Sequence, residues 1–115
     1  QDSVSDADTS EVTAMPDVAF VPVDPLVISL AGHQDSRQLR FRAQLEVASA
    51  HKTEVETLMP RVVDVLNSYL RALRIEDLTE SAAMVRLRAQ MLRRVQIVTG
   101  GDRVNDLLIM EFVLN

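Results

Sequence analysis

The sequence predicts an α+β domain in which a three-stranded sheet carries two helices on one face, in the order strand, strand, helix, helix, strand. Three patterns predict this class. Residues 38–47 alternate apolar and polar side chains. Two stretches between residues 55 and 98 repeat apolar residues at helical spacing, and residues 104–114 form the most apolar stretch of the chain. A chain of 115 residues has room for one small core, which must be mainly aliphatic because only 3% of the residues are aromatic.

Charge divides the chain into two parts. The net charge is −5, from 17 acidic and 12 basic residues, and residues 1–17 hold five of the acidic residues and no Lys or Arg. We therefore expect a disordered acidic linker at residues 1–17 and one domain at residues 18–115. That domain carries no net charge, which argues against nucleic-acid binding and removes one barrier to self-association.

A β-hairpin is the first predicted element. Pro22 and Pro25 exclude a helix from residues 20–30 and place this extended segment at the start or the edge of a sheet. Residues 31–36 form a turn cluster. The alternating strand at residues 38–47 follows, with its apolar side chains on one side and its polar side chains on the other.

The first helix is predicted from an apolar stripe over residues 55–73. Thr53 and Glu56 have the spacing of a capping box, which places the N-cap at Thr53. Pro60 projects to the polar side of the helix and should kink it or restart it. Residues 74–80 form a connector that carries the next N-cap.

The second helix is predicted from Ser81 to Val98 and ends before Gly100 and Gly101. One charged residue, Arg88, falls inside its apolar arc. Two roles for Arg88 are open: it snorkels or pairs with a nearby carboxylate, or it lies at a contact between subunits. The carboxylates considered for this pair are Asp64, Asp106 and Glu111.

Basic residues gather on the polar face of the same helix, at Arg86, Arg93 and Arg94. A basic stripe of this kind can bind anionic headgroups or an acidic partner, or it can be a solvated face. We keep these three arginines, together with Arg88, as candidate interface residues.

The last strand, residues 104–114, is apolar on both faces. One face is expected to carry Leu107, Ile109 and Val113, and the other Leu108, Met110, Phe112 and Leu114. Two helices can cover only one face of a three-stranded sheet, so we expect this strand to be central and its second face to need a cover. Either the N-terminal segment or another chain could supply it, and Leu107, Ile109 and Val113 are candidate interface residues.

The sequence carries no pattern of a catalytic, metal or cofactor site. There is no cysteine and no histidine pair at metal-ligand spacing. His33 in the hairpin turn and His51 before the first helix are expected to be turn or cap residues. The alternative is a small enzyme that uses one of them with a nearby carboxylate. No stretch approaches the ~20 apolar residues of a membrane span.

Several segments, taken in order, resemble the periplasmic domain of the FliL family of flagellar basal-body-associated proteins. The resembling segments are residues 25–30 (PLVISL), 38–47 (QLRFRAQLEV), 59–70 (MPRVVDVLNSYL), 75–78 (IEDL), 87–92 (LRAQML) and 107–115 (LLIMEFVLN). Together they extend over nearly all of residues 18–115.

This resemblance implies a stomatin/prohibitin-like (SPFH) fold and a protein without catalytic activity. It also implies a membrane-spanning helix upstream of residue 1, a periplasmic location at the flagellar basal body, and homo-oligomeric rings beside the stator proteins MotA and MotB. The expected role is support of stator engagement, torque and motility. A stomatin-like membrane scaffold or assembly adaptor unrelated to the flagellum is the alternative.

Overall fold

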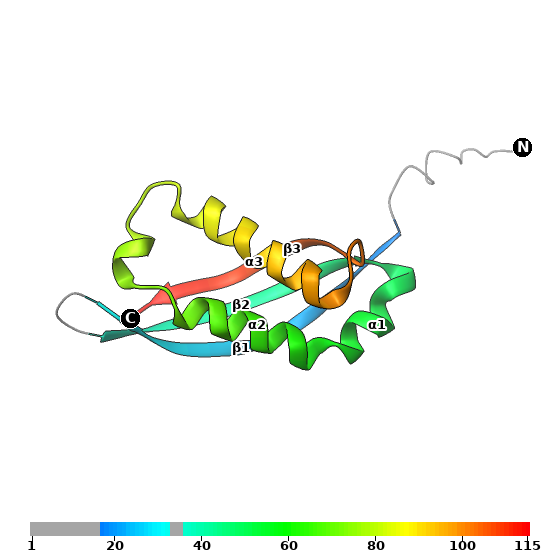
Figure 1. The fold of residues 1–115 in the computed structure, drawn as a ribbon, viewed down its shortest axis with the longest axis horizontal. Helices are drawn as coiled ribbons and strands as arrows, with labels where there is room; N and C mark the ends of the chain where they lie inside the picture. Colours follow the sequence, from blue (N-terminus) through cyan, green and yellow to red (C-terminus); the bar gives the residue numbers. More distant parts are fainter. Residues whose placement is uncertain (1–16, 33–35) are drawn as a thin grey trace, which may run out of the picture.

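The computed structural model describes residues 17–32 and 36–115 (Figure 1). Apart from Asp17, the predicted acidic linker lies outside the described residues, and so does His33. Asp17 is already joined to the domain. Its carbonyl accepts a hydrogen bond from the Ser49 N–H at 3.1 Å, and its carboxylate accepts one from the Ser49 hydroxyl at 2.7 Å.

Three strands and three α-helices build the described part of the chain, with short 3-10 segments between some of them. They are β1 (Val18–Ala31), β2 (Ser36–Ala48), η2 (Ser49–His51), α1 (Lys52–Thr57), α2 (Met59–Arg71), η3 (Ile75–Leu78), α3 (Ala83–Thr99) and β3 (Val104–Leu114). The predicted α+β class and the three-stranded sheet are confirmed, and the sheet is antiparallel throughout.

The strand order is β1-β2-β3, so β2 is central and β3 lies at an edge. The prediction of a central C-terminal strand is wrong. The physical reason is visible on β2, whose open face is polar at Arg40, Arg42, Gln44 and Glu46. A sheet with such a face tolerates water on one side, so the second face does not need the apolar cover that we expected.

A β-bulge explains why β3 is apolar on both faces. Its pairing with β2 shifts register between Glu111, opposite Arg42, and Ile109, opposite Ala43, which leaves Met110 as the extra residue. Leu107 and Ile109 before the bulge, and Phe112 and Leu114 after it, therefore all oppose buried residues of β2. Simple alternation put Phe112 and Leu114 on the other face, and that assignment is wrong.

The core lies between one face of the sheet and helices α2 and α3 (Figure 1). α2 packs on β1 and α3 packs on β3, and the two helices also contact each other. The core residues that the helices contribute recur at helical spacing: Val62, Leu66 and Leu70 from α2, and Leu87, Met91 and Val95 from α3.

Two predictions about the first helix have different outcomes. The predicted restart at Pro60 is confirmed: α1 ends at Thr57 and α2 begins at Met59, with Pro60 in its exposed first turn. The predicted capping box is wrong, because Thr53 lies inside α1 and His51 holds the N-cap position. The burial of the Val55 side chain fixes the position of α1 against the core. The free energy of this burial exceeds the roughly 1 kcal/mol that an N-cap at Thr53 would contribute.

Candidate interaction site

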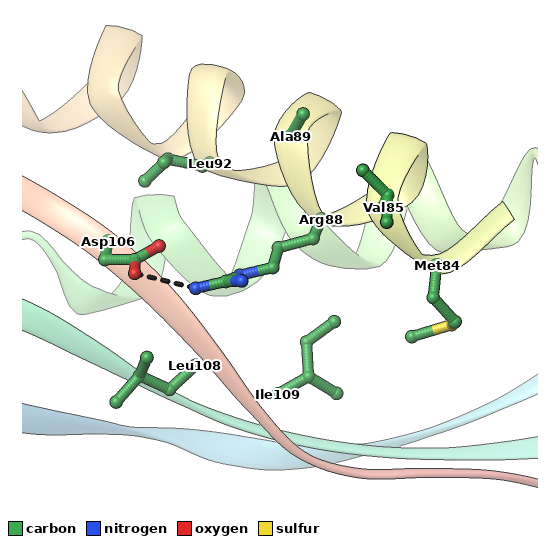
Figure 2. A pocket seen from close by; sticks show the side chains of 8 residues that line it. All are labelled: Met84, Val85, Arg88, Ala89, Leu92, Asp106, Leu108 and Ile109. Atoms are coloured by element: carbon green, nitrogen blue, oxygen red, sulfur yellow. Dashed lines mark hydrogen bonds and ion pairs between the residues drawn. The ribbon is translucent and has the colours of Figure 1, made fainter. Parts of the chain in front are cut away.

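An open groove of about 750 Å³ runs between α3 and the outer edge of β3 (Figure 2). Its α3 side is mainly apolar, and the ion pair between Arg88 and Asp106 crosses it. The residues that line it are Met84, Val85, Arg88, Ala89, Leu92, Asp106, Leu108 and Ile109. Two of these side chains are unusually exposed for apolar residues, with Met84 at 41% and Val85 at 76%.

Arg88 joins α3 to β3 by two contacts. Its Nη2 lies 2.7 Å from Asp106 Oδ2 (Figure 2). Its Nε donates a hydrogen bond to the carbonyl oxygen of Leu107 at 2.9 Å. Of the two predicted roles, pairing with a carboxylate is confirmed, and Asp106 is the partner. A role for Arg88 in contacts between subunits stays a prediction.

The same pair satisfies the backbone of β3 at Leu107. The N–H of Leu107 donates to Asp106 Oδ1 at 2.8 Å, while its carbonyl accepts from Arg88. Further along α3, Gln96 donates to the Val104 carbonyl at 3.0 Å. Side chains therefore occupy the outer backbone edge in the first half of β3. The sequence indicated Asp106 as a candidate partner of Arg88. No local sequence pattern predicted that the Gln96 side chain would bond to the backbone of β3.

The candidate interface residues of the last strand do not share one face. Leu107 is fully buried at 0% exposure and Ile109 is partly buried, both on the side of the helices. Val113 is 42% exposed and lies opposite Arg40, on the open face. The bulge at Met110 separates them, so the predicted shared face is wrong, and Leu107 cannot reach a partner.

The three arginines of the predicted stripe have separate surroundings. Arg86 forms an ion pair with Glu80 at 2.8 Å. Arg94 lies over the ring of Tyr69, with 4.5 Å between its Cζ and the ring centroid, and bonds to Gln90. Arg93 is exposed beside a shallow hollow near Gly101. Arg94 thus contributes to packing between α2 and α3 as well as to surface charge.

A second charged cluster lies where α1 begins and α3 ends. Glu54 Oε1 lies 2.8 Å from His51 Nδ1 and 3.2 Å from Arg103 Nε. The hydrogen bond from His51 is the main cause that lowers the pKa of Glu54, and the charge of Arg103 adds to it. Arg103 also donates to the Thr99 carbonyl at 2.7 Å. Through Glu54, α1 is tied to the turn that leads into β3.

This cluster offers little for catalysis. His51 and Glu54 are exposed, and no nucleophilic side chain joins them in the described contacts. Within residues 17–32 and 36–115, no group of three or more His, Cys, Asp or Glu side chains is placed to hold a metal ion. The best candidate for an interaction site in the described residues is therefore the groove between α3 and β3.

Comparison with known proteins identifies the family. The family described as "Flagellar basal body-associated protein FliL" matches residues 20–114. The chain belongs to the FliL family. Two curated relatives named "Flagellar FliL protein", from two strains of Caulobacter vibrioides (NA1000 / CB15N, and ATCC 19089 / CIP 103742 / CB 15), are each 31% identical over 112 residues.

The match covers 95% of this chain but 55% of each Caulobacter protein. The chain therefore spans about half the length of these FliL relatives. Membership confirms the resemblance seen in the sequence and associates the chain with the flagellar basal body and motility. FliL is a flagellar accessory family and not a known family of enzymes. Among the helices of the described residues, none has the length and hydropathy of a membrane span.

Proposed function

We propose that this FliL domain is the periplasmic part of a membrane-tethered accessory protein of the flagellar motor. It self-associates beside or around the stator proteins MotA and MotB and supports stator engagement, torque and motility. The observation that carries the proposal is the family match over residues 20–114, which covers the described strands and helices apart from Val18 and Ala19.

The composition and surface of the domain support a mechanical role over a catalytic one. Residues 18–115 carry equal numbers of acidic and basic residues, so like-charge repulsion between copies is small. The apolar side chains of Met84, Val85 and Met110 are exposed. We propose that Arg88, Ile109 and Val113 act at or near contacts between chains, and that Arg86, Arg93 and Arg94 are available to a partner.

The acidic residues 1–17 are proposed as the linker to a membrane-spanning helix. The Caulobacter relatives extend well beyond the matched region, which leaves room for such a tether. Sequencing the coding region upstream of residue 1 tests this directly. A run of about 20 apolar residues supports the tether, and its absence argues against it. A stomatin/prohibitin-like fold is also proposed, and superposition on solved structures of that class tests it.

Deletion of the gene from its bacterium tests the motor function. We expect reduced swimming speed and swarming, and fewer or less persistent foci of fluorescent MotB at the flagellar base. Complementation with the full-length gene should restore both readouts. If the deletion strain swims and swarms normally, with MotB foci unchanged, the proposed function is wrong.

A further inference from the structure

Each outer edge of the sheet is protected over only part of its length. The outer edge of β1 contains Pro22 and Pro25, which have no N–H to offer, and its register shifts between Val23 and Leu26. An isolated bridge from Ala31 to Arg74 covers the end of this strand. Beyond Pro25, the backbone groups of Val27 and Ser29 also point outward, because their partners Arg40 and Gln38 turn their own groups toward β3. The prolines therefore protect only part of this edge.

On β3 only the first half of the outer edge is protected. Gln96 occupies the Val104 carbonyl, and the Arg88–Asp106 pair occupies both backbone groups of Leu107. In the described part of the chain, no side chain donates to or accepts from the backbone of residues 111–114. The second half of β3 is therefore an open stretch of strand edge in the described part of the chain.

The backbone direction in this half follows from its last pair. Asn115 and Gln38 exchange both hydrogen bonds, N–H to C=O, at 2.8 and 3.2 Å, so the backbone groups of Asn115 point toward β2. Because successive residues of a strand alternate, the groups of Leu114 and Phe112 point outward, away from the sheet. Among the described residues no partner binds the N–H and C=O groups of these two residues, so they can pair with an added strand.

The side chains around this edge are apolar. Val113 is 42% exposed on the open face, and Phe112 and Leu114 are only partly covered on the helix side. Glu111 is the one charged residue between Ile109 and Leu114, and it is already paired with Arg42 at 3.2 Å. A strand that pairs with this edge should be apolar and should place no negatively charged side chain opposite Glu111.

The geometry points to a second copy of this chain as the occupant. We propose that residues 111–115 of β3 pair antiparallel with the same residues of another copy, about a two-fold axis at Val113. In this register Phe112 of each copy lies opposite Leu114 of the other. The outward N–H and C=O groups of each such pair bond to each other, so two hydrogen-bonded pairs form across the axis. Glu111 faces an Asn115 amide, and Val113 faces its own copy.

Two further features are compatible with a second copy as the occupant: the charges in the proposed register, and the side chains bonded to the backbone in the first half of β3. No side chains of like charge face each other in the proposed register, and the side chains of residues 18–115 carry no net charge. The capped residues Val104 and Leu107 lie outside the pairing, so the Arg88–Asp106 pair limits where it can extend. The acidic residues 1–17 of the chain are poor candidates for the same edge, because they combine five carboxylates with few apolar side chains.

This pairing rests on the self-association in the proposed function and names one surface for it. Because a two-fold contact closes at two copies, assembly around a stator needs a second contact as well. Cysteine cross-linking tests it cleanly, because the chain contains no cysteine. Directly opposed residues of a pair without backbone bonds have Cα atoms about 4.5 Å apart, within disulfide range. We therefore expect Val113→Cys in the 115-residue chain to form a disulfide-linked dimer under mild oxidation.

Asn105→Cys is the control on the same strand. Asn105 is also exposed, but it lies between Val104 and Leu107, where side chains occupy the strand edge, and outside the proposed pairing. It should stay monomeric under the same oxidation. Equal cross-linking of the two variants, or none for Val113→Cys, overturns the proposal.

Leu114→Pro provides an independent test without a new thiol. It removes an outward N–H that has no partner among residues 17–32 and 36–115, so the fold should survive, as circular dichroism can verify. Loss of two hydrogen bonds across the axis should raise the dimer dissociation constant roughly tenfold in sedimentation. An unchanged constant overturns the pairing. Motility of the deletion strain is a separate readout: normal swimming would refute the motor function while leaving the cross-linking result intact.

Discussion

Arg88 and Asp106 form an ion pair with 2.7 Å between Nη2 and Oδ2, and the same arginine closes the backbone edge of β3 at Leu107. The Arg88 side chain is 46% exposed, so the ion pair alone should contribute about 0–1 kcal/mol. Its second contact gives the residue a further role, because an unbonded strand edge favours association with other strands.

Replacing Arg88 should therefore affect both stability and association. We expect Arg88→Met to lower the free energy of unfolding by about 1–2 kcal/mol, since a hydrogen bond to the Leu107 carbonyl is lost with the ion pair. Light scattering on the variant should also show more self-association. Asp106→Asn is the control, because it keeps the Arg88–Leu107 bond. Equal losses in urea unfolding for the two variants would show that closing the edge contributes nothing.

Gly100 and Gly101 give a matched pair of substitutions in one turn. Gly100 has φ of +96°, and a Cβ there would lie 2.7 Å from Arg103 Nη1, whereas Gly101 has φ of +44° and open space around it. We expect Gly100→Ala to destabilise the domain by about 1–3 kcal/mol, and Gly101→Ala by about 1. Urea unfolding compares them. A larger cost at Gly101 would contradict the described turn.

The charged cluster of Glu54, His51 and Arg103 predicts that the stability of the domain depends on pH. Because its bond to His51 and the charge of Arg103 lower the pKa of Glu54 in the folded protein, the ionised carboxylate stabilises the fold. That contribution is complete above the unfolded-state pKa, near 4.5, and is lost as the pH falls through the lower folded-state value.

Glu54→Gln should accordingly destabilise the domain at neutral pH and make little difference in strong acid. Thermal unfolding from neutral pH down to about pH 3 measures the change, a range that brackets the titration of an ordinary carboxyl. Glu56→Gln is the control on the same helix, since Glu56 forms no ion pair within the described residues. A difference between Glu54→Gln and the parent that stays constant across this range would contradict the prediction.

Phe41 and Phe112 meet edge to face across β2 and β3, with ring centroids 6.3 Å apart at an interplanar angle of 89°. Phe41 is fully buried and Phe112 only partly. We expect Phe41→Ala to cost about 3–5 kcal/mol, and Phe112→Ala clearly less. A double-mutant cycle should return a coupling of about 0.5–1.5 kcal/mol. A coupling near zero would mean that the rings do not interact as described.

Local pattern was sufficient for much of the fold. Alternation marked β2, apolar repeats marked α2 and α3, and Pro60 marked the restart of the helix, because each signal arises within one or two turns of chain. The Arg88 pair was also within reach, since a charge inside an apolar arc demands a partner. Family membership, too, was visible in the order of short motifs.

Only the tertiary structure decided the position and the faces of β3. An apolar strand can be central, or it can lie at an edge with a bulge, and the choice depends on how it pairs with β2 and where α3 packs. The extra residue at Met110 reverses the facing of everything after it, and no local pattern marks that reversal. The difference between the two halves of the β3 edge also depends on tertiary structure. Arg88 and Gln96 can bond to the backbone of the first half only once α3 lies beside β3.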